Sequence, residues 1–244
     1  MTDISADFSH HKYRIYGAEP SPYSVKVRSY FRFKQIPHQW IIRSAGTMDE
    51  FDKFAKLAII PLVVSPQLQG SQDSTLVIEQ LEALHPHDSI YPEDTTVNFI
   101  STLLEEFGDE WGNKWMFHYR WARDIDQLAS ARRIAQLTQP DANSEQLDEL
   151  TEQVRQRMTG RLWFVGSNPE TAPQIEASLH LALEQLEVHL ESRPYLLGGR
   201  PSFGDFSLCG QLYNVWTDPT NCALIEAKMP NLLAWIQRML WPRI

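Results

Sequence analysis

One serine lies at a position where a chain could hold a negatively charged ligand group. Residues 20–24 read PSPYS, between a β-like segment at residues 13–16 and a helical pattern at residues 22–34. Ser21 therefore takes the N-cap position, with Pro22 as the first helical residue, which is a favourable helix start. A helix N-terminus has unpaired N–H groups and a partial positive charge, so it favours an anion. Ser21 is predicted either to bind an anionic group or to act as a helix cap only.

Two further stretches have both a chemical and a purely structural interpretation. Pro61 interrupts the apolar run of residues 59–64, where a cis peptide after Ile60 would fix a tight bend and an edge-strand proline is the alternative. Asp73 and Ser74 open the helical pattern of residues 74–84. They predict either a carboxylate-binding helix N-terminus or an ordinary N-cap.

An aromatic stripe occurs in the first helical segment of the second half of the chain. Trp111, Trp115 and His118 recur at i, i+4 and i+7, so they share one helix face. Such a face suits an aromatic ligand, and burial in the core is the alternative. The neighbouring pair Glu105–Glu106 is predicted to lie on a solvated face.

The elements that must position these residues divide the chain into two parts. Residues 13–91 alternate strand-like and helical segments, in the order β-α-β-α-β-(β)-α, which predicts a small mixed sheet with helices on both faces. From residue 95 onward only helices are predicted, at residues 95–122, 124–137, 144–160, 173–192, 203–216 and 230–240. The predicted organisation is a polar leader at residues 1–12, an α/β domain at 13–88, a linker within 85–94 and an all-α domain at 95–244.

Composition excludes several classes of function. The net charge of −9 disfavours nucleic acid as a partner, and no apolar run is long enough to cross a membrane. Cys209 and Cys222 are far apart and form no CxxC motif, which fits a reducing compartment and predicts a cytoplasmic protein. The first 12 residues lack the apolar segment of a secretory signal. No metal-binding spacing, P-loop, GxGxxG or GxSxG motif occurs, so no metal is expected.

A fourth stretch, near the C-terminus, has the spacing of a helix start that follows a tight turn. Ser202 and Asp205 have capping-box spacing after the turn YLLGG at residues 195–199, and MPNLLAWIQRM follows at residues 229–239. The order of the predicted elements, together with these four stretches, resembles the glutathione transferase superfamily over nearly the whole chain. The resemblance implies a thioredoxin-like N-terminal domain, an all-α helical bundle and a homodimer. The segment SPYSVKVR and the helix around residues 104–121 look more like serine-type bacterial branches, which include aryl-ether-cleaving enzymes.

The resemblance also implies roles for individual residues. Ser21 would be catalytic, donating a hydrogen bond that keeps the sulfur of glutathione as a thiolate. A cis peptide would precede Pro61. The residues expected to bind glutathione, the co-substrate, are Tyr23, Ile60, Pro61, Asp73 and Ser74. Those expected to bind a hydrophobic, aromatic electrophile in a conjugating, detoxifying reaction are Trp111, Trp115 and His118.

Departures from the family pattern leave alternatives open. Ile59 stands where many members have a Lys or Arg that contacts the glycyl carboxylate, a role that Arg43 or Lys53 could take instead. Ser24 or Tyr16 could replace Ser21 as the group that activates the thiol. Serines at both 21 and 24 disfavour thiol–disulfide exchange, because neither is a thiol. A glutathione-transferase-like protein with a binding or structural role and little catalysis is the alternative function.

Overall fold

A mixed four-stranded sheet organises the N-terminal part of the molecule. The computed structural model describes residues 12–243, so most of the predicted leader lies outside the described residues. The strands are β1 (Tyr13–Gly17), β2 (His38–Ile42), β3 (Leu62–Val64) and β4 (Gly70–Gln72), in the order β2-β1-β3-β4. Strand β1 pairs in parallel with β2 and antiparallel with β3, and β3 pairs antiparallel with β4. The Ile60–Pro61 peptide before β3 is cis.

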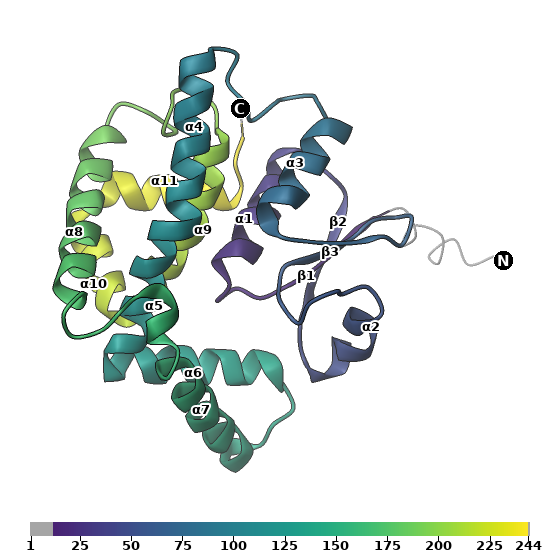
Figure 1. Cartoon of the computed structure of the whole chain (residues 1–244), viewed down its shortest axis with the longest axis vertical. Helices are drawn as coiled ribbons and strands as arrows, with labels where there is room; N and C mark the ends of the chain where they lie inside the picture. Colours follow the sequence, from purple (N-terminus) through teal and green to yellow (C-terminus); the bar gives the residue numbers. More distant parts are fainter. Residues whose placement is uncertain (1–11, 244) are drawn as a thin grey trace.

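Helices cover both faces of this sheet (Figure 1). Helices α1 (Pro22–Phe33) and α3 (Ser74–Leu84) lie on one face, and α2 (Met48–Asp52), preceded by the 3₁₀ turn η3 (Ala45–Thr47), lies on the other. Successive strand side chains point to opposite faces. Ile15 therefore joins the large core beneath α1, whereas Tyr16 packs with Phe51 of α2.

The second part of the chain is all-helical. Its elements are α4 (Thr95–Phe107), η4 (Gly108–Gly112), α5 (Asn113–Ala122), α6 (Asp124–Thr138), α7 (Ser144–Thr159), η5 (Leu162–Val165), α8 (Ala172–His189), α9 (Phe203–Trp216), α10 (Pro219–Lys228) and α11 (Pro230–Leu240). The helix expected at residues 95–122 is divided by a π-helical turn, η4. Helix α10 was not predicted. No helix among residues 12–243 is long and apolar enough to cross a membrane.

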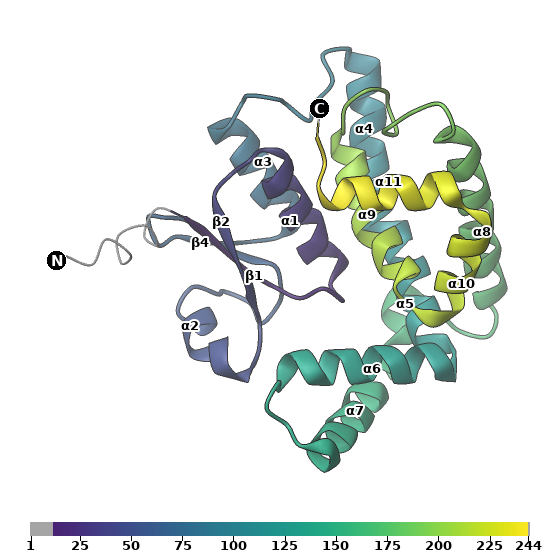
Figure 2. The same ribbon diagram turned by 180° about the vertical axis from the view of Figure 1, so that it is seen from behind.

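Helix α9 joins the two parts of the molecule. It runs between α1 and α4, as both ribbon views show (Figures 1 and 2). Two glycines allow this close approach: a Cβ on Gly210 would lie 2.5 Å from the Pro22 carbonyl oxygen, and one on Gly204 would lie 2.6 Å from Leu104 Cβ. Because the contact at Gly210 is with backbone at the first residue of α1, α9 fixes the start of that helix.

The predicted capping box forms at the start of α9. Buried Asp205 accepts hydrogen bonds from the N–H and the hydroxyl of Ser202 at 2.9 and 2.8 Å. It also accepts from the Leu196 N–H and from the indole of Trp235. A single carboxylate thus joins the helix start, the preceding turn and α11.

Candidate active site

Ser21 caps α1 and accepts two hydrogen bonds from one residue. Its Oγ lies 3.3 Å from the Ser24 N–H and accepts from the Ser24 hydroxyl at 2.9 Å. Ser24 is fully buried, whereas Ser21 is half-buried at a cavity wall. With both acceptor sites of Oγ occupied from the protein side, its own proton is available to donate outward.

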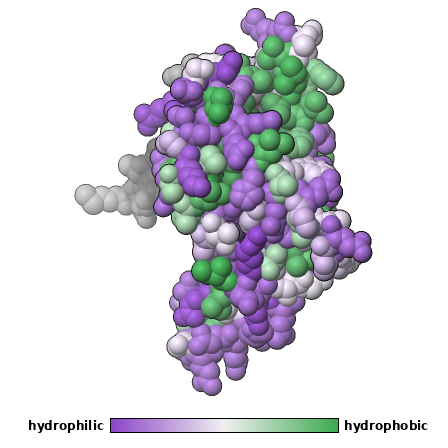
Figure 3. Space-filling view, turned by 90° about the vertical axis from the view of Figure 1, so that its left-hand side faces the viewer, coloured by the Kyte–Doolittle hydropathy of each residue, from purple (hydrophilic) through white to green (hydrophobic). Residues whose placement is uncertain are grey.

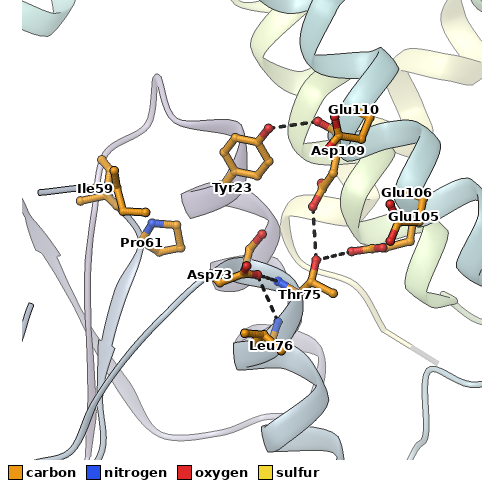
Figure 4. Close-up of a pocket in the computed structure, with 12 residues that line it drawn as sticks. Tyr23, Ile59, Pro61, Asp73, Thr75, Leu76, Glu105, Glu106, Asp109 and Glu110 are labelled. Carbon is orange, nitrogen blue, oxygen red and sulfur yellow. Dashed lines mark hydrogen bonds between the residues drawn. The ribbon is translucent and has the colours of Figure 1, made fainter. Parts of the chain in front are cut away.

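A cavity of about 490 Å³ lies between the sheet part and the helical part. Figure 4 shows its walls: the segment at residues 59–61, the start of α3, Tyr23 of α1, and acidic side chains of α4 and η4. Tyr23, Ile60, Pro61, Asp73 and Ser74 all line this one space. Asp73 has φ of +77° and caps α3, because its Oδ1 accepts from the N–H groups of Thr75 and Leu76.

The wall opposite Asp73 is acidic. Glu105, Glu106, Asp109 and Glu110 line the cavity, and with Asp73 they supply five carboxylates, with no Lys or Arg among the lining residues. Glu105 is 2% exposed, so the expectation of a solvated Glu105–Glu106 pair is wrong for Glu105, although Glu106 is exposed. Tyr23 donates to the Asp109 carbonyl at 3.0 Å, and burial raises the pKa of this phenol.

Buried Lys26 explains why Glu105 can be buried. The ammonium of Lys26 contacts the Glu105 carboxylate, Asp109 Oδ2 at 2.7 Å and Thr75 Oγ1 at 3.1 Å. Burial raises the pKa of Glu105, and the neighbouring ammonium opposes that shift. This cluster of Lys26, Thr75, Glu105 and Asp109 connects α1, α3, α4 and η4 behind the cavity wall. The lysine among the apolar positions of α1 was the sequence signal for a buried ionic partner.

A second cavity, of about 200 Å³, is lined by Ser21, which does not line the acidic cavity. It is lined by Ala18, Pro20, Ser21, Arg43, Ile60, Ile134, Leu137, Thr138 and Arg157. The loop between β1 and α1, the end of β2 and the helices α6 and α7 therefore meet around it. Ile60 lines both cavities, so both border the segment before the cis bond.

Comparison with known proteins assigns this architecture. A model of the glutathione S-transferase N-terminal domain matches residues 15–89, and one of the C-terminal domain matches residues 144–238. Together they span more than half of the chain. The chain belongs to the glutathione S-transferase family. The expected thioredoxin-like domain followed by an all-helical domain is confirmed.

Solved structures of a β-etherase and of glutathione transferases share the fold. β-Etherase LigF from Sphingobium sp. strain SYK-6 has a TM-score of 0.65 and 19% identity, with 93% of this chain and 94% of that chain covered. Glutathione transferase GSTFuA3 from Phanerochaete chrysosporium has a TM-score of 0.61 and 15% identity, with 96% and 98% covered. A glutathione S-transferase from Methylobacterium radiotolerans, in complex with glutathione sulfonate, has a TM-score of 0.56 and 18% identity, with 93% and 90% covered. No curated protein sequence matches the chain significantly.

The aromatic stripe lies away from both cavities of this glutathione S-transferase fold. Trp111 and Trp115 donate to Ser178 of α8 at 3.2 and 2.7 Å, and Trp115 is 1% exposed. Buried His118 contacts Ser167 at 2.8 Å and Glu176 at 3.0 Å. None of the three lines the space next to Ser21 or Pro61. Their helix face packs on α8 inside the bundle, and Trp115 borders a separate, mainly apolar cavity of about 380 Å³ between α4, α8 and α9. Electrophile binding by these three residues stays a prediction.

Tyr16 is also separated from these cavities. Its ring is fully buried between the sheet and α2, 5.9 Å from the ring of Phe51. Its hydroxyl has no hydrogen-bond partner among residues 12–243, and burial raises the pKa of Tyr16 to about 12. Tyr16 lines neither cavity, which leaves Ser21 as the hydroxyl best placed to meet a ligand sulfur.

The loop that carries Ser21 is held by Arg120, which belongs to the helical part of the chain. Arg120, buried on α5, donates to the Pro20 carbonyl oxygen at 2.8 Å. The same guanidinium donates to Asp218 and Asn214, each at 2.8 Å. These contacts span about 100 residues of sequence, so no local pattern predicts them. Among residues 12–243, no group of three or more His, Cys, Asp or Glu side chains could hold a metal ion.

Proposed function

We propose that this protein is a glutathione transferase in which Ser21 activates the thiol. The hydrogen bonding of Ser21 supports this proposal most directly. Because Ser24 donates to Ser21 Oγ from both its N–H and its hydroxyl, the Ser21 proton is directed toward the ligand side. A thiolate there would also lie near the positive end of α1. The thiolate then attacks an electrophilic carbon, the leaving group departs with its bonding electrons, and the thiol proton passes to solvent.

The acidic cavity suits the γ-glutamyl end of glutathione. Asp73 already caps the N–H groups of Thr75 and Leu76, so the N–H and hydroxyl of Ser74 would bind the γ-glutamyl carboxylate, while the surrounding carboxylates suit its α-ammonium. The backbone of Ile60, before the cis bond, would pair with the cysteinyl part. Tyr23 would close the side of this cavity nearest α1. In this arrangement the sulfur would lie at Ile60, beside Ser21.

Comparing turnover of a neutral aryl halide by wild type and by Ser21→Ala tests the proposal. A hydrogen bond to a charged group contributes about 1.5–3 kcal/mol, which corresponds to about a 10- to 150-fold loss of kcat/KM. The pH at which the bound thiol ionises should rise by about one to two units, since one unit equals about 1.4 kcal/mol. Tyr16→Phe is the matched control, because it removes a hydroxyl that lines neither cavity, and it should retain wild-type turnover.

The Ser24→Ala variant separates the two serines. It leaves the Ser21 hydroxyl in place but removes a donor to it, so a smaller loss of turnover than in Ser21→Ala is expected. If Ser21→Ala keeps the wild-type rate and pH profile, Ser21 is a helix cap only and the proposed mechanism is wrong.

The second candidate is a glutathione-transferase-like binding protein with little catalysis. The observation in its favour is the absence of Lys and Arg from the lining of the larger cavity, including position 59, while glutathione carries two carboxylates. A thermal-shift titration separates the candidates, since a ligand at 100 times its Kd stabilises the folded state by about 2.7 kcal/mol. A rise in midpoint with glutathione supports the enzyme, and no rise at millimolar glutathione supports the alternative.

A homodimer is part of the proposal. Apolar side chains are exposed on α4 and α3, including Phe99, Leu103, Leu76 and Leu84. Figure 3 shows apolar side chains gathered over the upper part of one face of the molecule. Burying such a surface between two copies would stabilise a dimer.

A cytoplasmic location and the serine-type bacterial branch belong to the same proposal, and the two unpaired cysteines support the location.

A further inference from the structure

The two cavities that meet at Ile60 differ in charge. The larger one has five carboxylates and no cationic side chain in its lining, whereas the one beside Ser21 has Arg43 and Arg157 and no carboxylate. The remaining walls of the smaller cavity are mainly apolar, with Ile134 and Leu137 supplied by α6. The space beside the proposed catalytic hydroxyl is therefore apolar and positively charged.

Neither arginine of this cavity forms an ion pair or a side-chain hydrogen bond within the part of the chain that the structure describes. Most other arginines among residues 12–243 contact a carboxylate or a carbonyl oxygen; Arg155, for example, pairs with Glu152 on the same helix. Arg43 makes no side-chain hydrogen bond or ion pair with residues 12–243, and its Nε is buried without a partner among them. Its guanidinium makes a cation–π contact, 4.7 Å from the centre of the Phe51 ring. Arg157 is exposed and also lacks a hydrogen bond or ion pair among the described residues. Arg43 is half-buried at the cavity, so its guanidinium is available to an anionic ligand there.

We propose that this cavity binds a carboxylate carried by the electrophile. The preferred second substrate would then be a compact electrophile that carries an acidic group on an apolar body, such as an aromatic ring. This inference rests on the proposed function, because Ser21 defines which end of the ligand reacts. Arg43 and Arg157 would hold the carboxylate, and Ile134 and Leu137 would contact the ring.

The size of the cavity agrees with this ligand class. An apolar cavity of about 150 Å³ is large enough for benzene, so about 200 Å³ holds one ring with a substituent. A carboxylate could also come from the glycine of glutathione. That small polar group would leave the apolar side chains of α6 exposed to water. We therefore assign the carboxylate to the electrophile, and the experiment distinguishes the two sources.

The first arm compares two matched electrophiles, 4-chloro-3,5-dinitrobenzoate and 4-chloro-3,5-dinitrobenzamide, at saturating glutathione. Arg157→Gln should lower kcat/KM for the benzoate about 10-fold, the lower end of the range for a hydrogen bond to a charged group, because Arg157 is exposed. The benzamide should change less than about 2-fold, and Arg157→Lys should recover part of the benzoate activity. Arg161→Gln is the control, since it removes the same charge four residues later, beyond the end of α7 and outside the lining of the cavity.

The second arm measures binding without turnover. The probes are 3,5-dinitrobenzoate and 3,5-dinitrobenzamide, which lack the chloride leaving group, titrated calorimetrically into wild type and Arg157→Gln. Tighter binding of the benzoate to wild type, lost in the variant, supports the inference even if no aryl halide is turned over. In that case the proposed transferase activity fails while the anion-binding site stands.

The third arm tests the glycine of glutathione as the source. Wild type, Arg43→Gln and Arg157→Gln are compared with glutathione and with γ-glutamylcysteine, which lacks the glycine, using the benzamide as electrophile. An unchanged KM for glutathione in both variants supports our assignment. An increase in KM for glutathione but not for γ-glutamylcysteine overturns it, as does an equal loss of activity with the benzoate and the benzamide.

Discussion

Replacing Lys26 by methionine tests whether the buried ionic cluster supports the wall of the larger cavity. Lys26 is 1% exposed, and its ammonium is the only cation that contacts the carboxylates of Glu105 and Asp109 among the residues described. Methionine keeps most of the length and apolar character of the side chain. The substitution therefore removes the charge and leaves two neighbouring carboxylates without their cation.

The expected loss of stability is large. Removing one partner of a buried ion pair costs about 3–5 kcal/mol, because the remaining charge stays buried and uncompensated. In a chain of this size each kcal/mol shifts Tm by about 2–4 °C, so a decrease of roughly 6–20 °C is expected. Thr75 still donates to Glu105 at 2.6 Å, and Ser207 still donates to Asp109 at 2.6 Å, which favours the lower part of that range.

The effect should depend on pH in a defined direction. Burial raises the pKa of Glu105, whereas Lys26 lowers it, so this pKa should rise further in the variant. A raised folded-state pKa means that the folded protein holds its proton more tightly than the unfolded chain does. The contribution to stability is therefore present at low pH and is lost as pH rises through the folded-state pKa. The stability difference between variant and wild type should be larger at pH 8 than at pH 5.

Urea unfolding at both pH values measures this difference, and the double variant Lys26→Met/Glu105→Gln is the control. The double variant has the same net charge in the cluster as wild type, so it should recover a large part of the stability. A loss below about 1 kcal/mol in the single variant, or a double variant that is no more stable than the single one, would refute the reasoning.

Three further predictions concern other parts of the fold. Arg120→Met removes the donor to the Pro20 carbonyl and leaves Asp218 without one of its cations, so kcat should fall and unfolding should begin at lower urea, measured by steady-state kinetics and denaturation. Asp205→Asn replaces a buried carboxylate that accepts four hydrogen bonds and should cost about 1–3 kcal/mol, measured by urea unfolding. Burial raises the pKa of the Cys209 thiol, so a thiol reagent should label half-buried Cys222 first and Cys209 only on unfolding.

Local patterns in the sequence were sufficient to predict many elements of the fold. Ser21 with Pro22, and Ser202 with Asp205, are signals whose partners lie within three residues, and both form as expected. Helix α9 was predicted with its observed bounds, Phe203–Trp216. The cis bond before Pro61 was expected from the family resemblance, whereas the strand order β2-β1-β3-β4 was not predicted.

Long-range orientation could not be predicted from one sequence. The spacing of Trp111, Trp115 and His118 predicts a shared helix face but not which neighbour that face meets, and in the structure the neighbour is α8. Glu105 looked solvated because its partner, Lys26, is 79 residues away. Arg157 gave no sequence signal at all, since its position depends on how α7 packs beside the loop of Ser21.

The glycine at position 210 has a consequence for how the two halves of this protein could be recombined with those of relatives. At Gly210 helix α9 meets the main chain of Pro22 and the Cβ of Lys26. A foreign N-terminal half would therefore have to start its first helix along the same line and also supply a cation in place of Lys26 for the carboxylates of Glu105 and Asp109. Gly210→Ala would push Pro22 away and so displace the neighbouring Ser21 hydroxyl, although the alanine would not contact Ser21 itself.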